Sequence, residues 1–217
     1  MEKKCDYVSF CYKLSLKDLE EHNTPGWTKS IQDLLSSFGF GDVWFNQGVG
    51  DTDLFLKCFK ERLKDVFCQE WHCRLHNSTR ADFYRVYKNS FITSNYIELL
   101  PNKQFREALC RFLTSSHCLR IESGRWQRNP NIPRDQRFCF NCPYKIEDEY
   151  HFVLECSLYI NIRLQLIPRY FRTNPSMYKF IQLLNSNKKK HILCLAKYIY
   201  KCFKLRSEAV TNTEQSL

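Results

Sequence analysis

Three cysteines and one histidine lie within eighteen residues in the pattern C-x2-C-x8-H-x4-C. They are Cys139, Cys142, His151 and Cys156. Two cysteines three positions apart can direct both sulfur atoms at one centre from a tight turn, and the later histidine and cysteine can complete a tetrahedron around Zn²⁺. Because four protein ligands fill such a centre, the spacing predicts a structural zinc site, the only cofactor expected, and no catalytic metal.

An alternative interpretation is that these residues are ordinary buried cysteines and a hydrogen-bonded histidine. Twelve cysteines among 217 residues make chance proximity less surprising than usual. The alternative does not account for a C-x-x-C pair directly upstream of a correctly spaced His and Cys. A further ligand pair at His117 and Cys118 is a weaker possibility, and Cys58, Cys68 and Cys110 read as small apolar residues at helical spacing.

The segment between the two halves of the motif sets a geometric condition. The acidic run 147–149 is expected to open a short helix that carries His151, because carboxylates interact well with the first turn of a helix. Five helical residues turn about 500°, so Cys156 would lie roughly 140° around the axis from His151. Both can reach one metal only if the helix loosens or ends near Cys156. Phe152 and Leu154 are expected to pack against the body of the protein.

Composition predicts a folded, mostly α-helical protein with a small zinc-knuckle unit. Hydrophobic residues make up 43% of the chain and aromatic residues 15%, enough to bury a core. Residues 1–6 show no signal-peptide pattern. The most apolar run, 192–203, is interrupted by Lys197 and Lys201 and does not resemble a membrane span. We therefore expect an intracellular protein of the nucleus or cytoplasm with reduced thiols and no membrane partner.

Hydrophobic periodicity and turn residues divide the chain into regions. These are an N-terminal connector with a short helix (1–50), a helical region (51–118), a basic loop plus zinc-binding unit (119–173), basic C-terminal helices (174–206) and a disordered tail (207–217). Helices are predicted at 28–38, from Asp51 or Thr52 onward, and at 80–88, 102–115, 157–170 and 188–206. The helix at 157–170 is expected to end at Pro168 or at the Asn174-Pro175 turn. Residues 43–45 are expected to be extended. The long helix after Asp51 is expected to bury one face along Leu54, Phe55, Phe59, Leu63, Val66, Phe67, Trp71 and Leu75.

The net charge of +10 and pI near 9.0 favour a polyanionic partner, with nucleic acid first. Residues 119–137 read as a loop in which arginines alternate with Trp126, Gly and Pro, a composition suited to phosphates and unpaired bases. The residues predicted to contact nucleic acid are Arg125, Trp126, Arg128, Arg134, Arg137 and Lys145. The alternative is a solvated connector whose arginines pair with carboxylates of neighbouring helices. The lysines and Arg206 of 188–206 similarly suit either a phosphate backbone or a solubilising face.

The metal motif resembles the CCHC-type zinc-binding segment at the C-terminal end of non-LTR (LINE-type) retrotransposon reverse transcriptases. That pattern is approximately C-x2-C-x4-E-[TD]-x2-H-x4-C, and the four ligands together with Glu147 and Asp148 match it. The following segments are also similar to the family: Trp27, Leu34-Leu35, Gly39-Phe40, Val43-Trp44, 59–63, 69–71, 121–125 and 137–139. The resemblance covers most of residues 27–170 and is most specific around the metal motif.

The resemblance implies a part that holds template RNA or target DNA during target-primed reverse transcription. A polymerase of this type needs paired aspartates for its metal ions, and this chain contains no Asp-Asp pair. Residues 50–53 read as a helix cap instead. We therefore expect a non-enzymatic nucleic-acid-binding zinc module that corresponds to a detached C-terminal piece. The alternatives are a zinc-stabilised scaffold for a protein partner, contacted through Tyr144, Tyr150 and Tyr159, and a non-functional remnant.

Overall fold

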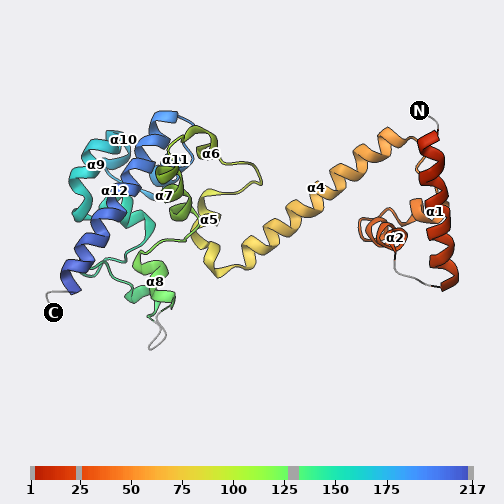
Figure 1. Ribbon diagram of the computed structural model, residues 1–217. Coiled ribbons are helices and arrows are strands. Elements are labelled where there is room, and N and C mark those ends of the chain that lie inside the picture. The colour runs from red at the N-terminus through yellow and green to blue at the C-terminus, as the bar shows by residue number, and fades with distance from the viewer. Residues whose placement is uncertain (1–2, 23–25, 127–131, 215–217) are drawn as a thin grey trace. The chain divides into compact units, whose positions relative to one another are not determined.

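The computed structural model describes residues 3–22, 26–126 and 132–214. The chain divides into two compact units, residues 1–73 and 74–217, and this division falls inside the predicted helical region 51–118. Within the described ranges the secondary structure is helical, with a single antiparallel bridge between Phe138 and Ile146 in place of any sheet (Figure 1). The predicted mostly α-helical fold is confirmed.

The first unit contains α1 (Lys3–His22), α2 (Trp27–Ser37), α3 (Gly41–Asn46) and most of α4 (Thr52–Asn77), whose last residues belong to the second unit. The Thr28 hydroxyl joins α2 to α1 through the side chain and carbonyl of Ser15. A cluster of four aromatic rings joins the segment after α2 to α4: Phe38, Phe40, Phe55 and Phe59. Among the described residues of this unit, only Thr28 and Leu35 are buried.

Two predictions for the first unit are wrong. Residues 43–45 are helical rather than extended, because Gly39 at φ +83° ends α2 and the Phe40 carbonyl accepts from the Val43 N–H to start α3. The apolar stripe of α4 is not buried, and its Leu54 is 60% exposed. The predicted start of α4 is confirmed, because Asp51 Oδ1 accepts two backbone N–H bonds of the first turn.

The second unit is a helical body around an apolar core. Its helices are η1 (Thr79–Ala81), α5 (Asp82–Tyr87), α6 (Tyr96–Leu99), α7 (Lys103–Leu113), α8 (Arg120–Trp126), η2 (Arg134–Gln136), η3 (His151–Glu155), η4 (Ser157–Tyr159), α9 (Ile160–Leu166), α10 (Arg169–Arg172), α11 (Met177–Leu184) and α12 (Lys189–Glu214). Helix α12 runs beside α7 through the middle of this body (Figure 1). Phe112, Phe152 and Ile199 are fully buried between them and the metal-binding segment.

The structure corrects three further predictions in the second unit. The range 157–170 is not one helix: it begins with the 3-10 turn η4, and α10 follows α9. The predicted end at Pro168 is confirmed, because α9 stops before this residue, which lacks a backbone N–H. The range 119–137 is not one loop, because α8 occupies 120–126 and buries Ile121 against the core. The range 207–214 continues α12 rather than forming a disordered tail, and residues 215–217 lie outside the described part.

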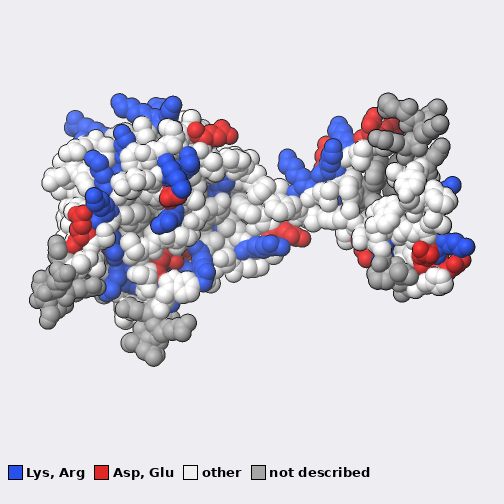
Figure 2. Space-filling view, viewed as in Figure 1, with Lys and Arg blue, Asp and Glu red and all other residues white. Residues whose placement is uncertain are grey.

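The charge of the chain divides unequally between the units. Residues 74–217 contain 24 Lys and Arg against 11 Asp and Glu, a formal charge of +13, whereas residues 1–73 carry −3. Figure 2 shows Lys and Arg spread over the second unit with few acidic side chains between them. A search of the described helices found none with the length and hydropathy needed to cross a membrane.

Candidate metal centre

The first two ligands lie in a tight turn closed by backbone hydrogen bonds. The Cys139 N–H donates to the Lys145 carbonyl at 2.7 Å, and the Lys145 N–H donates to the Cys142 carbonyl at 3.3 Å. Tyr144 reverses the chain at φ +63°, in the left-handed region. This turn holds two cysteine side chains on the same side, as a C-x-x-C metal ligand pair requires.

The other two ligands are joined by a helix that widens. Asp148 Oδ1 accepts from the His151 N–H at 2.8 Å and caps the helix start. From His151 to Glu155 the chain is a π-helix, and the Cys156 N–H donates to the His151 carbonyl at 2.7 Å. Cys156 itself leaves the helix at ψ 125°. The predicted loosening of this helix is confirmed, and π-turns of this kind are frequent at functional sites.

The four ligand atoms converge. The Cys156 Sγ lies 3.9 Å from the Cys139 Sγ and 3.8 Å from the Cys142 Sγ, and all four atoms lie within 4.8 Å of one another. A metal bound tetrahedrally by thiolates at about 2.3 Å separates its sulfur ligands by roughly 3.8 Å. Cys139, His151 and Cys156 are buried, and Cys142 is half-buried. The arrangement can hold a metal ion.

The environment of the metal-free ligands favours ionisation of one cysteine. Hydrogen bonding with Cys156, together with backbone N–H groups of Asn141 and Cys142, lowers the pKa of Cys139 to about 4. The same hydrogen bond raises the pKa of Cys156, which keeps the proton. Burial disfavours the charged form of His151, but the adjacent Cys139 thiolate outweighs it and raises the pKa of His151 to about 9. A bound cation would replace the protons held by His151 and Cys156.

A carboxylate orients the histidine ligand. His151 Nδ1 lies 3.5 Å from Glu155 Oε2, and Lys145 Nζ lies 3.8 Å from the same oxygen. His151 Nε2 is buried without a hydrogen-bond partner, which is expected of the nitrogen that faces a metal. Histidine ligands commonly donate their second ring N–H to a carboxylate, which fixes the tautomer. Lys145, which was predicted to contact nucleic acid, is 65% exposed and also pairs with the carboxylate beside the histidine ligand.

Buried polar contacts attach the metal-binding segment to the helical body. Arg206 of α12 forms two hydrogen bonds of 2.7 and 2.8 Å with the Glu147 carboxylate, which also accepts from the Arg120 N–H. Arg163 of α9 donates to the carbonyls of Val153 and Cys156. Arg206 is buried and therefore belongs neither to a phosphate-binding face nor to a solubilising face, the two alternatives predicted for it. Sequence reasoning missed both arginines as structural residues, because their acceptors lie far away in the chain or on the backbone.

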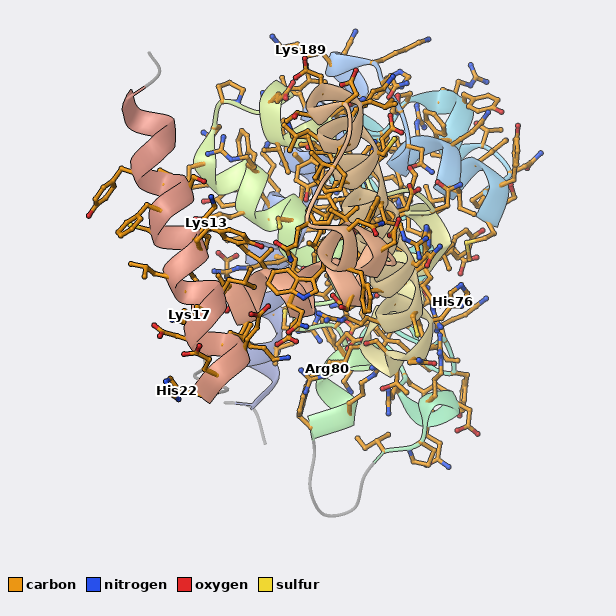
Figure 3. The ribbon with its side chains drawn as sticks, turned by 90° about the vertical axis from the view of Figure 1, so that its right-hand side faces the viewer. Lys13, Lys17, His22, His76, Arg80 and Lys189 are labelled. Carbon is orange, nitrogen blue, oxygen red and sulfur yellow. The ribbon has the colours of Figure 1, made fainter. Side chains whose placement is uncertain are left out.

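Several predicted nucleic-acid contacts gather around one acidic side chain. Asp82 of α5 pairs with Arg85, with Arg125 at 3.6 Å and with Arg134 at 3.2 Å. The exposed ring of Trp126 carries the guanidinium of Arg80 at 4.2 Å from its centroid, and Figure 3 shows Arg80 beside α8. We call Arg80, Arg85, Arg125, Arg134 and Trp126 the arginine cluster. The predicted alternative of pairing with carboxylates holds in part, but one carboxylate is shared by three cations.

Three other predictions concern single residues. Arg137 is buried, donates to the carbonyls of Ile121 and Ile132, and lies against Gly124, a location that does not fit a phosphate contact. Arg128 lies outside the described residues. Of the three tyrosines predicted to be exposed, Tyr144 is 90% exposed, whereas Tyr159 is buried against Phe152 in the core.

His117 and Cys118, the weaker possibility for a second ligand pair, do not form one in the described structure. His117 Nε2 bonds instead to Glu149 Oε1 at 3.1 Å, and the group of four ligands described above does not include Cys118. The His117 ring packs against Phe112 and Phe203 in the core. His117 therefore helps to attach the metal-binding segment to α7 and α12.

Comparison with known proteins returned no match among protein-family models, curated proteins or solved structures.

Proposed function

We propose that this chain is a non-catalytic, nucleic-acid-binding zinc module that resembles the C-terminal part of a non-LTR retrotransposon reverse transcriptase. The observation that carries the proposal is the formal charge of +13 on residues 74–217, the unit that contains the Cys3His group. Such an excess attracts the phosphate backbone and releases its counterions. Four protein ligands leave the metal no open position, so the metal supports the fold rather than a reaction.

Zinc is the ion that best suits the ligand set. Thiolate and imidazole donors at tetrahedral spacing are typical of structural zinc sites. Native mass spectrometry should show one zinc per chain. Zinc uptake near pH 7 should release at least two protons, one from His151 and one from Cys156, and the apparent affinity should rise with pH because protons compete for the ligands. Calorimetry in buffers of different ionisation enthalpy measures that number, and uptake without proton release would contradict it.

The arginine cluster supports a phosphate and base contact. Three of its guanidinium groups share the carboxylate of Asp82, and Arg125 also lies 3.5 Å from Glu122. The fourth, that of Arg80, lies over the Trp126 ring, so positive charge remains in excess. Trp126 is 59% exposed and offers a ring on which an unpaired base can stack. Three thiolates and Zn²⁺ sum to about −1, so the cations rather than the metal attract phosphate.

Salt dependence tests the proposal. Affinity for single-stranded and duplex RNA and DNA should fall steeply as salt rises. The double variant Arg134→Ala/Lys145→Ala should reduce the slope of log K against log salt by about 1.4 to 1.8 if each side chain neutralises one phosphate. Lys13→Ala/Lys17→Ala removes the same charge from two exposed lysines of α1, labelled in Figure 3, and is the matched control. A flat salt response of the unmodified protein would refute nucleic-acid binding.

A scaffold for a protein partner is the second candidate. It is favoured by apolar side chains that the first unit leaves exposed, among them Tyr7 at 72%, Phe10 at 59% and Phe45 at 89%. Many exposed apolar side chains on one part of a protein are typical of protein-binding surfaces. If the variants Phe10→Ser and Phe45→Ser still bind nucleic acid strongly, then nucleic-acid binding does not depend on this exposed apolar surface, and the two roles belong to different parts of the chain.

A further inference from the structure

A cavity of about 590 Å³ opens in the second unit between α7, α12 and the turn at 116–118. Its floor includes the half-buried rings of Tyr200 and Phe203, and its rim includes exposed Arg111 and Lys204. The volume lies within the range of small-ligand sites in proteins. The cavity contains none of the metal ligands and none of the arginine cluster.

The rim carries positive charge that the protein does not neutralise. Within the described ranges, neither Arg111 nor Lys204 forms an ion pair. The acidic residue at the rim, Glu107, pairs with Lys103 at 3.8 Å. Two cations on facing helices therefore border the opening without a carboxylate partner. This arrangement suits an anionic group of a ligand, such as a phosphate.

The wall of the cavity contains an unsatisfied polar atom. The side chain of His117 is 1% exposed and lines the cavity, and its Nδ1 has no hydrogen-bond partner within the described structure. A buried polar nitrogen without a partner costs free energy, which a ligand or a water molecule can recover. Tyr200 is fixed by an edge contact with Phe105 at 5.4 Å and stays half-buried. The wall thus combines an aromatic ring with a hydrogen-bonding atom.

We infer that this cavity holds one unpaired nucleotide of a single-stranded nucleic acid, with its phosphate between Arg111 and Lys204 and its base against Tyr200. An aromatic ring beside cations is the usual combination for binding single strands, and a base can enter a cavity only when it is unpaired. This inference rests on the proposed function and adds a contact separate from the arginine cluster.

The metal centre supports the wall of this site. His117 is held by Glu149, which lies two residues before the ligand His151. Loss of the metal should therefore loosen the segment that fixes His117. Nucleotide binding in the cavity is expected to weaken on chelation even though no metal ligand lines it.

Photocrosslinking and affinity measurements on the zinc-loaded full chain test the inference. The probes are single-stranded oligonucleotides of about 12 residues carrying 5-iodouracil, one series of RNA and one of DNA. Crosslinked peptides should contain Tyr200 or Phe203. Arg111→Ala/Lys204→Ala should lower affinity at low salt by about tenfold or more, and Tyr200→Phe should bind like the parent while Tyr200→Ala loses about fivefold or more.

Lys189→Ala/Lys190→Ala is the matched control, because it removes two exposed lysines of α12 outside the cavity, Lys189 being labelled in Figure 3. The substituted side chains Arg111, Lys204, Lys189 and Lys190 are all exposed, so thermal melting should be unchanged in both variants. Binding that weakens equally in the two double variants, with crosslinks elsewhere, would overturn the cavity site and leave the proposed function standing. Absence of any oligonucleotide binding would overturn both. A preference for the RNA or the DNA series identifies the strand that enters.

Discussion

The two units of this chain differ in what holds them together. In residues 74–217 the described core includes ten or more side chains at 2% exposure or less, among them Phe112, Phe152 and Tyr198. Among the described residues of 1–73, Leu35 is the only buried apolar residue, with an exposed fraction of 9%. Burial of apolar area is the main source of folding free energy. The second unit therefore has its own source of stability, and the first has little beyond aromatic edge contacts.

Charge follows the same division. The unit with the core and the ligand group carries +13, and the unit with the exposed apolar helices carries −3. A strong net charge destabilises a compact state by self-repulsion. In the second unit the buried Glu147–Arg206 pair links the metal-binding segment to α12, and the four candidate ligands converge within that segment. The same kind of change, made once in each unit, should therefore have a different effect on stability.

Removal of the metal should have the largest effect and should be confined to the second unit. Structural zinc contributes about 10 kcal/mol of apparent binding free energy in small zinc units. In this chain a metal ion held by the Cys3His group would join segments 138–146 and 147–157. Hydrogen exchange before and after chelation should show amide protection lost across 138–157 and weakened in α12, with α2 unchanged. Protection lost equally in both units, or in neither, would contradict the comparison.

Breaking a charged pair should give the next largest difference. Arg206→Met leaves the Glu147 carboxylate buried without its cation, which costs about 3 to 5 kcal/mol. Glu147→Gln in the same chain removes the charge while keeping an acceptor for the Arg120 N–H, and should restore most of the loss. Lys29→Met breaks the 3.0 Å pair with Asp33 in the first unit, where both groups are exposed.

That matched change in the first unit should cost about 0 to 1 kcal/mol, because water screens an exposed pair. Urea denaturation followed by hydrogen exchange in each unit measures the two losses side by side. Equal losses at Arg206 and Lys29 would mean that the Glu147 pair contributes no more than a surface pair and that the core, rather than the pair, attaches the metal segment.

Local patterns predicted α2, α4, α5, α7, α12 and the ligand group, because each depends on neighbouring residues. Helix α1 was not predicted, and α3 was predicted to be extended. The spacing of Cys139, Cys142, His151 and Cys156 was sufficient to predict convergence, and the 140° offset between the last two required the loosening that the π-helix provides. The N-cap of α4 was likewise predicted from Asp51, and the start of α7 from the segment at Asn102, whose side chain accepts from the Phe105 N–H.

Contacts between distant segments were beyond local patterns. Arg206 reads as one more cation among lysines, and only the fold brings it to Glu147, 59 residues earlier. The α4 stripe has the period of a buried face, but a period does not supply the partner that covers it. Helix α8 was missed because Gly124 and several arginines give its sequence the composition of a loop.

Gly124 also provides the smallest and most selective comparison. An alanine Cβ at this position would lie 2.9 Å from three atoms of the Arg137 side chain, whose guanidinium is held by the Ile121 carbonyl at 2.7 Å and the Ile132 carbonyl at 3.0 Å. Because Arg137 cannot move without losing these bonds, Gly124→Ala should destabilise the second unit by about 1 to 3 kcal/mol.

The same substitution in the first unit should have the opposite sign. Gly41 begins α3, and the nearest atom to an added Cβ is Ser36 Oγ at 3.9 Å, so Gly41→Ala should stabilise by about 0.4 to 1 kcal/mol through reduced entropy of the unfolded chain. Hydrogen exchange in α3 and α8 measures both effects. In an Arg137→Ala background the cost of Gly124→Ala should disappear, because the obstructing side chain is gone. If the cost persists there, the tight packing of α8 does not depend on Arg137, and the contrast between the two glycines has another origin.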